Sequence, residues 1–176
     1  MSTVVECDAW VALGANLGER AATLASAVRA LQRLPHSRVL AVSAWYENPA
    51  VGGPPQPDFL NGVARLQTAL APLRLLDALL DIEQDHGRQR DGQSNAPRTL
   101  DLDLLWHAQG PLQHPRLSLP HPRIAERPFV LLPWLELDPD AALPGWGRLR
   151  DCWLQLGAPT LPAVSRYPLQ SGANDV

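Results

Sequence analysis

Two aspartates, Asp101 and Asp103, lie in the stretch "NAPRTLDLDLLW", residues 95–106, which otherwise has the apolar composition of a buried β-strand. Side chains two residues apart on a strand project from the same face, with backbones roughly 6.6 Å apart. The two carboxylates are therefore expected to point together, while the alternating leucines point the other way. Burying an ionised carboxylate without a partner costs several kcal/mol, so only one face of this strand is expected to be hydrophobic core.

Paired carboxylates suit Mg²⁺, which takes one or two of them and completes its shell with water and substrate phosphates. Two such ions about 3.5–4 Å apart could clamp a phosphoryl group. The alternative is a solvated sheet face on which each aspartate pairs with an arginine, because D-x-D is a short and common pattern. Arginine forks also suit phosphate oxygens, and the flanking arginines favour a metal–polyphosphate site. These arginines are Arg88, Arg90, Arg98, Arg116, Arg123 and Arg127.

Composition restricts the class of protein. The chain has 176 residues, of which 45% are hydrophobic and 19% charged, as expected of one globular domain. Fifteen basic side chains against eighteen acidic ones give a net charge of -3, without the basic surplus that generic nucleic-acid binding needs. All the basic residues are arginines, so a P-loop, which requires lysine, is excluded.

The compartment can be inferred from three further features. Cys7 and Cys152 are the only cysteines, and two cysteines make neither a zinc site nor a disulfide framework. The N-terminal "MSTVVECDAW" lacks the basic and long apolar regions of a signal peptide. No apolar run reaches transmembrane length. We therefore expect a cytoplasmic protein that has no membrane partner.

The pattern along the chain predicts the order strand, helix, strand, strand, helix, strand, followed by short helices. This order indicates an α+β fold, namely a ferredoxin-like antiparallel sheet with helices packed on it in three αβα layers. Residues 1–156 are expected to form a single domain and residues 157–176 a loosely ordered tail. The expected strands are 9–13, 38–46, 58–70 and the acidic strand. One expected helix ends at residue 34, a second spans 72–87, and two short ones lie within 129–137 and 148–156.

The stretch "PRTLDLDLL" resembles the signature of the 6-hydroxymethyl-7,8-dihydropterin pyrophosphokinase family. Four other segments are similar to that family in the same order, and the similarity runs from about Ala9 to Leu156. They are "VALGANLG" (11–18), "WYENPAVGGPPQPDFLN" (45–61), "IEQDHGRQR" (82–90) and "RLSLPHPRIAERPFVLLP" (116–133).

The resemblance implies transfer of pyrophosphate from ATP to the hydroxymethyl group of a reduced pterin, with release of AMP, in folate biosynthesis. It implies two Mg²⁺ ions held by Asp101 and Asp103, with Arg90 and Arg98 as catalytic residues beside them. The pterin would be bound by Asn48, Val51, Phe59, Asn61 and Phe129. ATP would be bound by Arg90, Arg98, Leu104, Arg116, Leu117, Ser118, His121 and Arg127. The expected partners are these two small molecules, and the chain is expected to be a monomer.

Several positions depart from the family pattern. Ser94, Asn95 and Ala96 replace a basic residue, a tryptophan and a glycine, and Pro122 replaces an aromatic residue. Leu80 and Asn48 also depart from the family pattern. Arg123 is expected to be a solvated loop residue. We expect activity, with altered loop closure and rate. Two rivals stay open, namely a non-catalytic ferredoxin-like module for RNA or a regulatory nucleotide, and a paralogue that binds without turnover.

Overall fold

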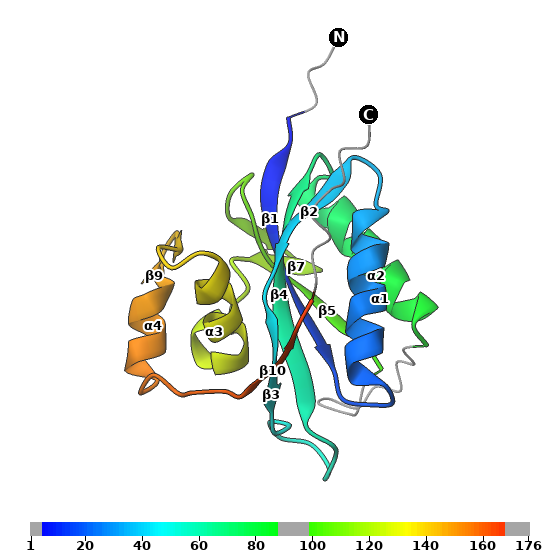
Figure 1. Ribbon diagram of the computed structural model, residues 1–176. Helices are drawn as coiled ribbons and strands as arrows, with labels where there is room; N and C mark the ends of the chain where they lie inside the picture. The colour runs from blue at the N-terminus through cyan, green and yellow to red at the C-terminus, as the bar shows by residue number, and fades with distance from the viewer. Residues whose placement is uncertain (1–4, 88–98, 168–176) are drawn as a thin grey trace, which may run out of the picture.

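The computed structural model describes residues 5–87 and 99–167. Its centre is a six-stranded sheet in the order β10-β3-β4-β1-β5, with β2 also paired to β4, and every pairing is antiparallel (Figure 1). The structure therefore confirms an α+β fold with an antiparallel sheet. The six strands are β1 (Cys7–Ala15), β2 (Ser37–Val42), β3 (Ala44–Asn48), β4 (Phe59–Thr68), β5 (Asp101–His107) and β10 (Ala163–Arg166).

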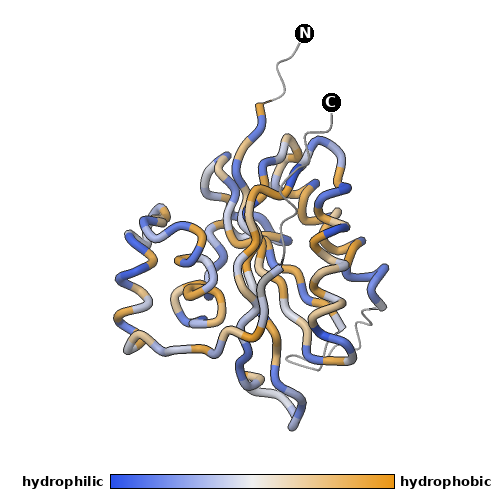
Figure 2. The backbone as a smooth tube through the Cα atoms, in the orientation of Figure 1, coloured by the Kyte–Doolittle hydropathy of each residue, from blue (hydrophilic) through white to orange (hydrophobic). Residues whose placement is uncertain are grey.

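Helices lie on both sides of the sheet (Figure 1). On one side are α1 (Arg20–Gln32) and α2 (Pro72–Asp85), and on the other are α3 (Pro128–Leu137) and α4 (Leu149–Gln155). Hydrophobic and hydrophilic positions alternate along α1 (Figure 2), as expected of a helix that buries one face. The buried residues of α1 are Leu24, Ala27, Val28 and Leu31.

Each face of the sheet has its own apolar cluster. Leu13, Leu66 and Leu104 belong to the cluster that α1 and α2 cover. Trp10 and Val63 belong to the second cluster, where the Trp10 ring stacks on Trp134 of α3 with 4.9 Å between centroids. Because strand side chains alternate between faces, one set of strands supplies both cores. The candidate site shares the α3 side of the sheet with the second cluster.

The expected strand over 38–46 is divided into β2 and β3 at Ser43. The buried Ser43 hydroxyl accepts a hydrogen bond from the Val63 N–H at 2.9 Å and donates to the Ala44 carbonyl at 2.8 Å. The side chain thus replaces a backbone acceptor of the ladder, and the regular pairing is interrupted there. Both halves still pair with β4.

The expected loosely ordered tail also contains regular structure. Ala163–Arg166 form β10, which pairs with the edge strand β3. This pairing provides hydrogen-bond partners for backbone groups of the tail. Amino-acid composition does not predict it, because the partner strand is distant in the sequence. The smaller elements are β6 (Leu112–His114), β7 (Leu117–Leu119), η1 (Ile124–Glu126), β8 (Ala142–Leu143) and β9 (Gly147–Arg148). Among residues 5–87 and 99–167, no helix has the length and apolar character needed to cross a membrane.

Candidate active site

The floor of the candidate site is a set of cross-strand neighbours on β4, β1 and β5. Gly14 of β1 pairs with Asn61 on one side and with Asp101 on the other. Ala12 likewise pairs with Val63 and with Asp103. Neighbouring strands lie about 4.8 Å apart, so Asn61 and Asp101 are separated by one small residue. Because Ala12 and Gly14 have a small side chain or none, space is left above the sheet at these two positions of β1.

A cavity of about 540 Å³ lies over this floor. It combines three carboxylates, two arginines, two aromatic rings and three amides, a mixture that suits a flat heterocycle next to a charged group. Its lining residues are Ala12, Leu13, Gly14, Asn48, Pro49, Ala50, Val51, Gln56, Phe59, Asn61, Asp101, Asp103, Arg123, Glu126, Arg127, Pro128, Phe129, Val130 and Leu161.

All five residues predicted to bind the pterin line this one cavity. Asn61 and Asn48 are only 8% and 6% exposed, and the Asn61 amide nitrogen donates to the Asn48 side-chain oxygen. The Asn48 amide nitrogen in turn donates to the Pro49 carbonyl at 3.0 Å. Each amide offers two donors and two acceptor lone pairs, which is more than these bonds use. The two buried amides orient each other and present polar edges to the cavity.

Arg127 connects the acidic pair with the aromatic wall. Its Nη1 donates to Asp103 Oδ2 at 3.2 Å, and its guanidinium carbon lies 5.9 Å from the centroid of the Phe129 ring. The Asp103 carboxylate is therefore paired with an arginine, as one of the two sequence interpretations expected. A phosphate group entering the cavity would meet this arginine as well as the carboxylates.

His121 lies close to the same charges. Its backbone N–H donates to the Leu105 carbonyl at 2.8 Å, and its Nδ1 accepts from the Arg123 N–H at 3.2 Å. Burial, followed by the nearby Arg127 and Arg123, lowers the pKa of His121 to about 4, and Asp101 opposes this shift. The ring is therefore neutral at pH 7. Because Nδ1 is an acceptor, the proton is on Nε2, which can donate to a ligand.

The other predicted ATP residues are placed differently. Leu104 and Leu117 are buried in the cluster under α1 and α2, so a contact with ATP would use their backbone atoms. The Arg116 guanidinium forms an ion pair with Asp77 of α2. The Ser118 hydroxyl donates to the Gln113 side-chain oxygen at 3.3 Å, away from the cavity lining. Arg90, Arg98 and the departures at 94–96 lie outside the described residues.

Residues 10–139 match the family described as 7,8-dihydro-6-hydroxymethylpterin-pyrophosphokinase. This chain belongs to that family. It is 45% identical over 159 residues to the 2-amino-4-hydroxy-6-hydroxymethyldihydropteridine pyrophosphokinase of Pseudomonas aeruginosa, with 90% of this chain and 96% of the relative covered. The protein of the same name from Haemophilus influenzae is 38% identical over 136 residues, with 77% of this chain and 84% of the relative covered.

Solved structures show the same fold. The Plasmodium falciparum HPPK-DHPS structure with pterin and p-hydroxybenzoate has a TM-score of 0.68 at 13% identity. That match covers 90% of this chain but only 44% of the larger chain, so the pyrophosphokinase corresponds to less than half of it. At this low identity the likeness concerns the fold alone, and the family assignment depends on the sequence matches.

The acidic pair is compatible with a Mg²⁺ site whose remaining ligands would be water and phosphate oxygens. Among residues 5–87 and 99–167, no group of three or more His, Cys, Asp or Glu side chains could hold a metal by itself. Asp101 and Asp103 place two carboxylates on one face of β5, with Gly14 and Ala12 as their neighbours on β1. Magnesium typically takes one or two carboxylates together with water and phosphate oxygens. Two carboxylates are therefore enough for a metal that arrives with a nucleotide.

Several residues that line the cavity were missed by the sequence interpretation. Arg123 is 53% exposed, as expected of a solvated loop residue, but it also lines the cavity and pairs with Glu126 at 3.4 Å. Gly14 lies within the segment "VALGANLG", but only the strand register places it between Asn61 and Asp101. Leu161 comes from the segment expected to be loosely ordered. No sequence signal connects Leu161 with the acidic strand, since the two come to line one cavity only in the folded chain.

Proposed function

We propose that the cavity over β1, β4 and β5 is the active site in which the pyrophosphokinase reaction takes place. The reaction is the transfer of pyrophosphate from ATP to the hydroxymethyl group of 6-hydroxymethyl-7,8-dihydropterin, in folate synthesis. In our proposal, the hydroxymethyl oxygen forms a bond to the β-phosphorus. The bond between this phosphorus and the oxygen shared with the α-phosphate breaks, and AMP leaves with that oxygen. The observation that carries the proposal is that the predicted pterin residues and the acidic pair line one cavity.

On the pterin side, Phe59 and Phe129 would hold the bicyclic ring between two aromatic faces. Stacked rings contribute apolar area and an offset contact between π systems. Asn61 and Asn48 would bind the polar edge of the ring, because an amide matches a heterocycle that presents both donors and acceptors. Val51 is exposed at the cavity edge and would contribute its backbone groups.

On the phosphate side, the positively charged groups would stabilise the charge that develops during transfer. Asp101 and Asp103 would hold two Mg²⁺ ions, and the metal would supply positive charge that offsets the negative charge of the triphosphate. Arg127 and Arg123 line the cavity next to these carboxylates and would contact phosphate oxygens directly. Neutral His121 would donate from Nε2. Alignment and charge stabilisation supply most of the acceleration in reactions of this kind, and no side-chain nucleophile is required.

The finer description of the fold is also a proposal. We describe it as ferredoxin-like in three αβα layers, with additional C-terminal helices, because β1 and β2 both pair with β4, which lies between them. We assign residues 1–156 to one pyrophosphokinase domain, to whose sheet residues 163–166 add β10. We further propose a cytoplasmic monomer that binds neither nucleic acid nor membranes. The net charge of -3 and the free thiols of Cys7 and Cys152 agree with this proposal.

The acidic pair can be tested by Asp101→Ala and Asp103→Ala. Each variant should lower the rate of AMP release at least about 100-fold, because charge stabilisation of the transferred group is lost. Folding should be retained, since removing one carboxylate relieves repulsion with the other, and the Asp103–Arg127 pair that the second variant loses is partly exposed to solvent. AMP release with ATP, Mg²⁺ and hydroxymethyl-dihydropterin, together with the thermal midpoint, measures both effects. Asp140→Ala, at an exposed position away from the cavity, is the matched control.

The same assay separates the proposal from its rivals. Unchanged turnover in the two aspartate variants would contradict the metal assignment. Binding of both substrates by the wild type without AMP release would indicate a paralogue that binds but does not react. Failure to bind the pterin would favour a binding module of another kind.

A further inference from the structure

The segment from Gly157 to Tyr167, here termed the C-terminal strap, connects the two sides of the active-site cavity. Figure 1 shows it leaving α4 and crossing to β3, at the opposite edge of the sheet from β5. At its start, the Trp153 indole N–H donates to the Pro159 carbonyl at 3.4 Å. Further along, the Glu47 N–H donates to the Pro162 carbonyl at 3.0 Å, and β10 then pairs with β3. The strap is therefore attached at both of its ends.

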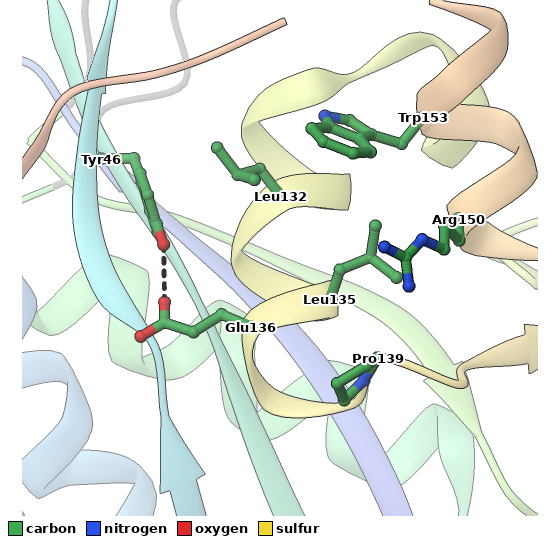
Figure 3. A pocket seen from close by; sticks show the side chains of 7 residues that line it. All are labelled: Tyr46, Leu132, Leu135, Glu136, Pro139, Arg150 and Trp153. Carbon is green, nitrogen blue, oxygen red and sulfur yellow. Dashed lines mark hydrogen bonds between the residues drawn. The ribbon is translucent and has the colours of Figure 1, made fainter. Parts of the chain in front are cut away.

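The elements that hold the strap are themselves connected. Trp153 of α4 faces Leu132 and Leu135 of α3 across a small cavity of about 250 Å³ (Figure 3). On the other side of this cavity, the Tyr46 hydroxyl of β3 donates to Glu136 Oε2 of α3 at 2.8 Å, which Figure 3 marks with a dashed line. Because α3 adjoins both α4 and β3, it sets the distance between the two elements that the strap connects.

Leu161 lies between these two attachments and lines the active-site cavity. The next residue along, Pro162, is bonded to Glu47, whose neighbour Asn48 is a proposed pterin residue. The backbone of the strap is therefore hydrogen-bonded to Glu47, the residue that precedes Asn48. The family match covers residues 10–139, so this part of the cavity wall comes from a segment beyond it.

We propose that Leu161 is a specificity-determining residue, which forms an apolar wall for the pterin and not for ATP. The inference rests on the proposed active site, and it adds a contact from outside the matched region. An apolar side chain among Asn48, Val51 and Phe129 excludes water from the ring and limits its position. Leu161 adjoins the β3 edge of the sheet, whereas the acidic pair is on β5 at the opposite edge, so we expect the nucleotide not to depend on this wall.

Two variants of opposite volume test the wall. Leu161→Ala should raise the KM for the pterin about fivefold, which corresponds to the loss of part of one leucine contact. Leu161→Trp should raise the same KM more, because the larger ring occupies pterin space. In both variants the KM for ATP should stay within about twofold of the wild type. Val164→Ala is the matched control, because Val164 is an exposed residue of the same strap outside the cavity.

A direct binding measurement supplements the kinetics. Calorimetry with 6-hydroxymethylpterin can be carried out on enzyme loaded with the α,β-methylene analogue of ATP, whose modified bond is the one that the reaction breaks. The pterin Kd should rise in both Leu161 variants and stay unchanged in Val164→Ala. Thermal midpoints of the three variants should lie close together, because Leu161 is only half-buried.

Two results would overturn the inference. One is a pterin Kd and KM that are unchanged in both folded Leu161 variants. The other is an equal change in the constants for ATP and pterin, which would indicate a general structural effect of the strap. A wild-type enzyme that releases no AMP with the pterin would instead overturn the active-site proposal, and this inference with it.

Discussion

Gly14 shows how a single backbone position can decide whether a site is open. A Cβ atom on this residue would lie 2.7 Å from the Asn61 side-chain oxygen and 3.8 Å from the Phe59 ring. Gly62, on the neighbouring strand, is equally crowded, but a Cβ there would lie 2.5 Å from two ring carbons of the buried Trp45. An amide at the end of a short side chain can rotate, whereas a ring packed in the core cannot.

The two glycines should therefore respond differently to alanine. Gly14→Ala should displace the Asn61 amide and raise the KM for the pterin about tenfold, roughly the cost of one lost hydrogen bond. Gly62→Ala should instead lower the free energy of unfolding by about 1–3 kcal/mol through overpacking. Steady-state kinetics and urea unfolding of both variants separate the effects. A Gly14 variant with wild-type pterin KM would show that Asn61 does not bind the substrate.

The connection between β3 and β4, residues 49–58, is attached to the rest of the protein near its second end. The Asn16 amide nitrogen donates to Gln56 Oε1 at 2.8 Å and to the Pro57 carbonyl at 3.1 Å. Arg20 donates to the Asp58 carbonyl at 2.8 Å. Val51, in contrast, is 66% exposed. The loop therefore has a fixed base and an exposed tip that the pterin can contact.

Removing the amide attachment by Asn16→Ala should loosen this loop. The KM for the pterin should rise about threefold to tenfold. The reason is that about 1 kcal/mol is needed to order the loop, and in the variant this free energy opposes pterin binding. The KM for ATP should change little. Hydrogen exchange of residues 49–58 should become faster in the free variant and slow on addition of the pterin. Ser26→Ala, which removes a hydrogen bond to His86 between α1 and α2, is the control. Equal exchange rates in Asn16→Ala and wild type would contradict the attachment.

At the scale of the whole molecule, two histidines are kept neutral by the fold. Burial lowers the pKa of His107, and its hydrogen bond to the Leu70 carbonyl opposes this shift. The pKa of His121 is lowered to about 4. In the unfolded chain both would bind protons near pH 6.5, so unfolding takes up protons below that pH. The free energy of unfolding should consequently fall as the pH is lowered from 6.5 towards 4.

Urea unfolding between pH 7 and pH 5 measures this dependence. Each histidine contributes at most about 1.4 kcal/mol per pH unit, and His121 contributes less because it is partly exposed to solvent. The free energy of unfolding of the His107→Gln variant should fall less steeply as the pH is lowered. The difference in this free energy between the wild type and the variant should therefore become smaller at lower pH. His36→Asn, at an exposed position, is the control. A gap that stays constant over this range would show that His107 is not kept neutral.

Local patterns were sufficient for most of the elements. Alternation of apolar residues placed Asp101 and Asp103 on one face of β5, and the structure puts the intervening leucines in the opposite cluster. Pro72 correctly marked the first residue of α2. These features depend on neighbours a few residues apart, so their physical causes are contained in a short segment. The break at Ser43 was missed because it depends on a hydrogen bond to Val63 of another strand.

Residue types and local spacing are enough to indicate the acidic strand face, the arginine-rich surroundings, the order of elements and the resemblance to a family. The folded chain was needed to show that Gly14 separates Asn61 from Asp101 and that Arg123 and Leu161 line the cavity. The reason is that strand register and the path of the strap are set by packing between distant segments. Residue types and spacing therefore indicate the chemistry, whereas long-range pairing determines which side chains share the cavity.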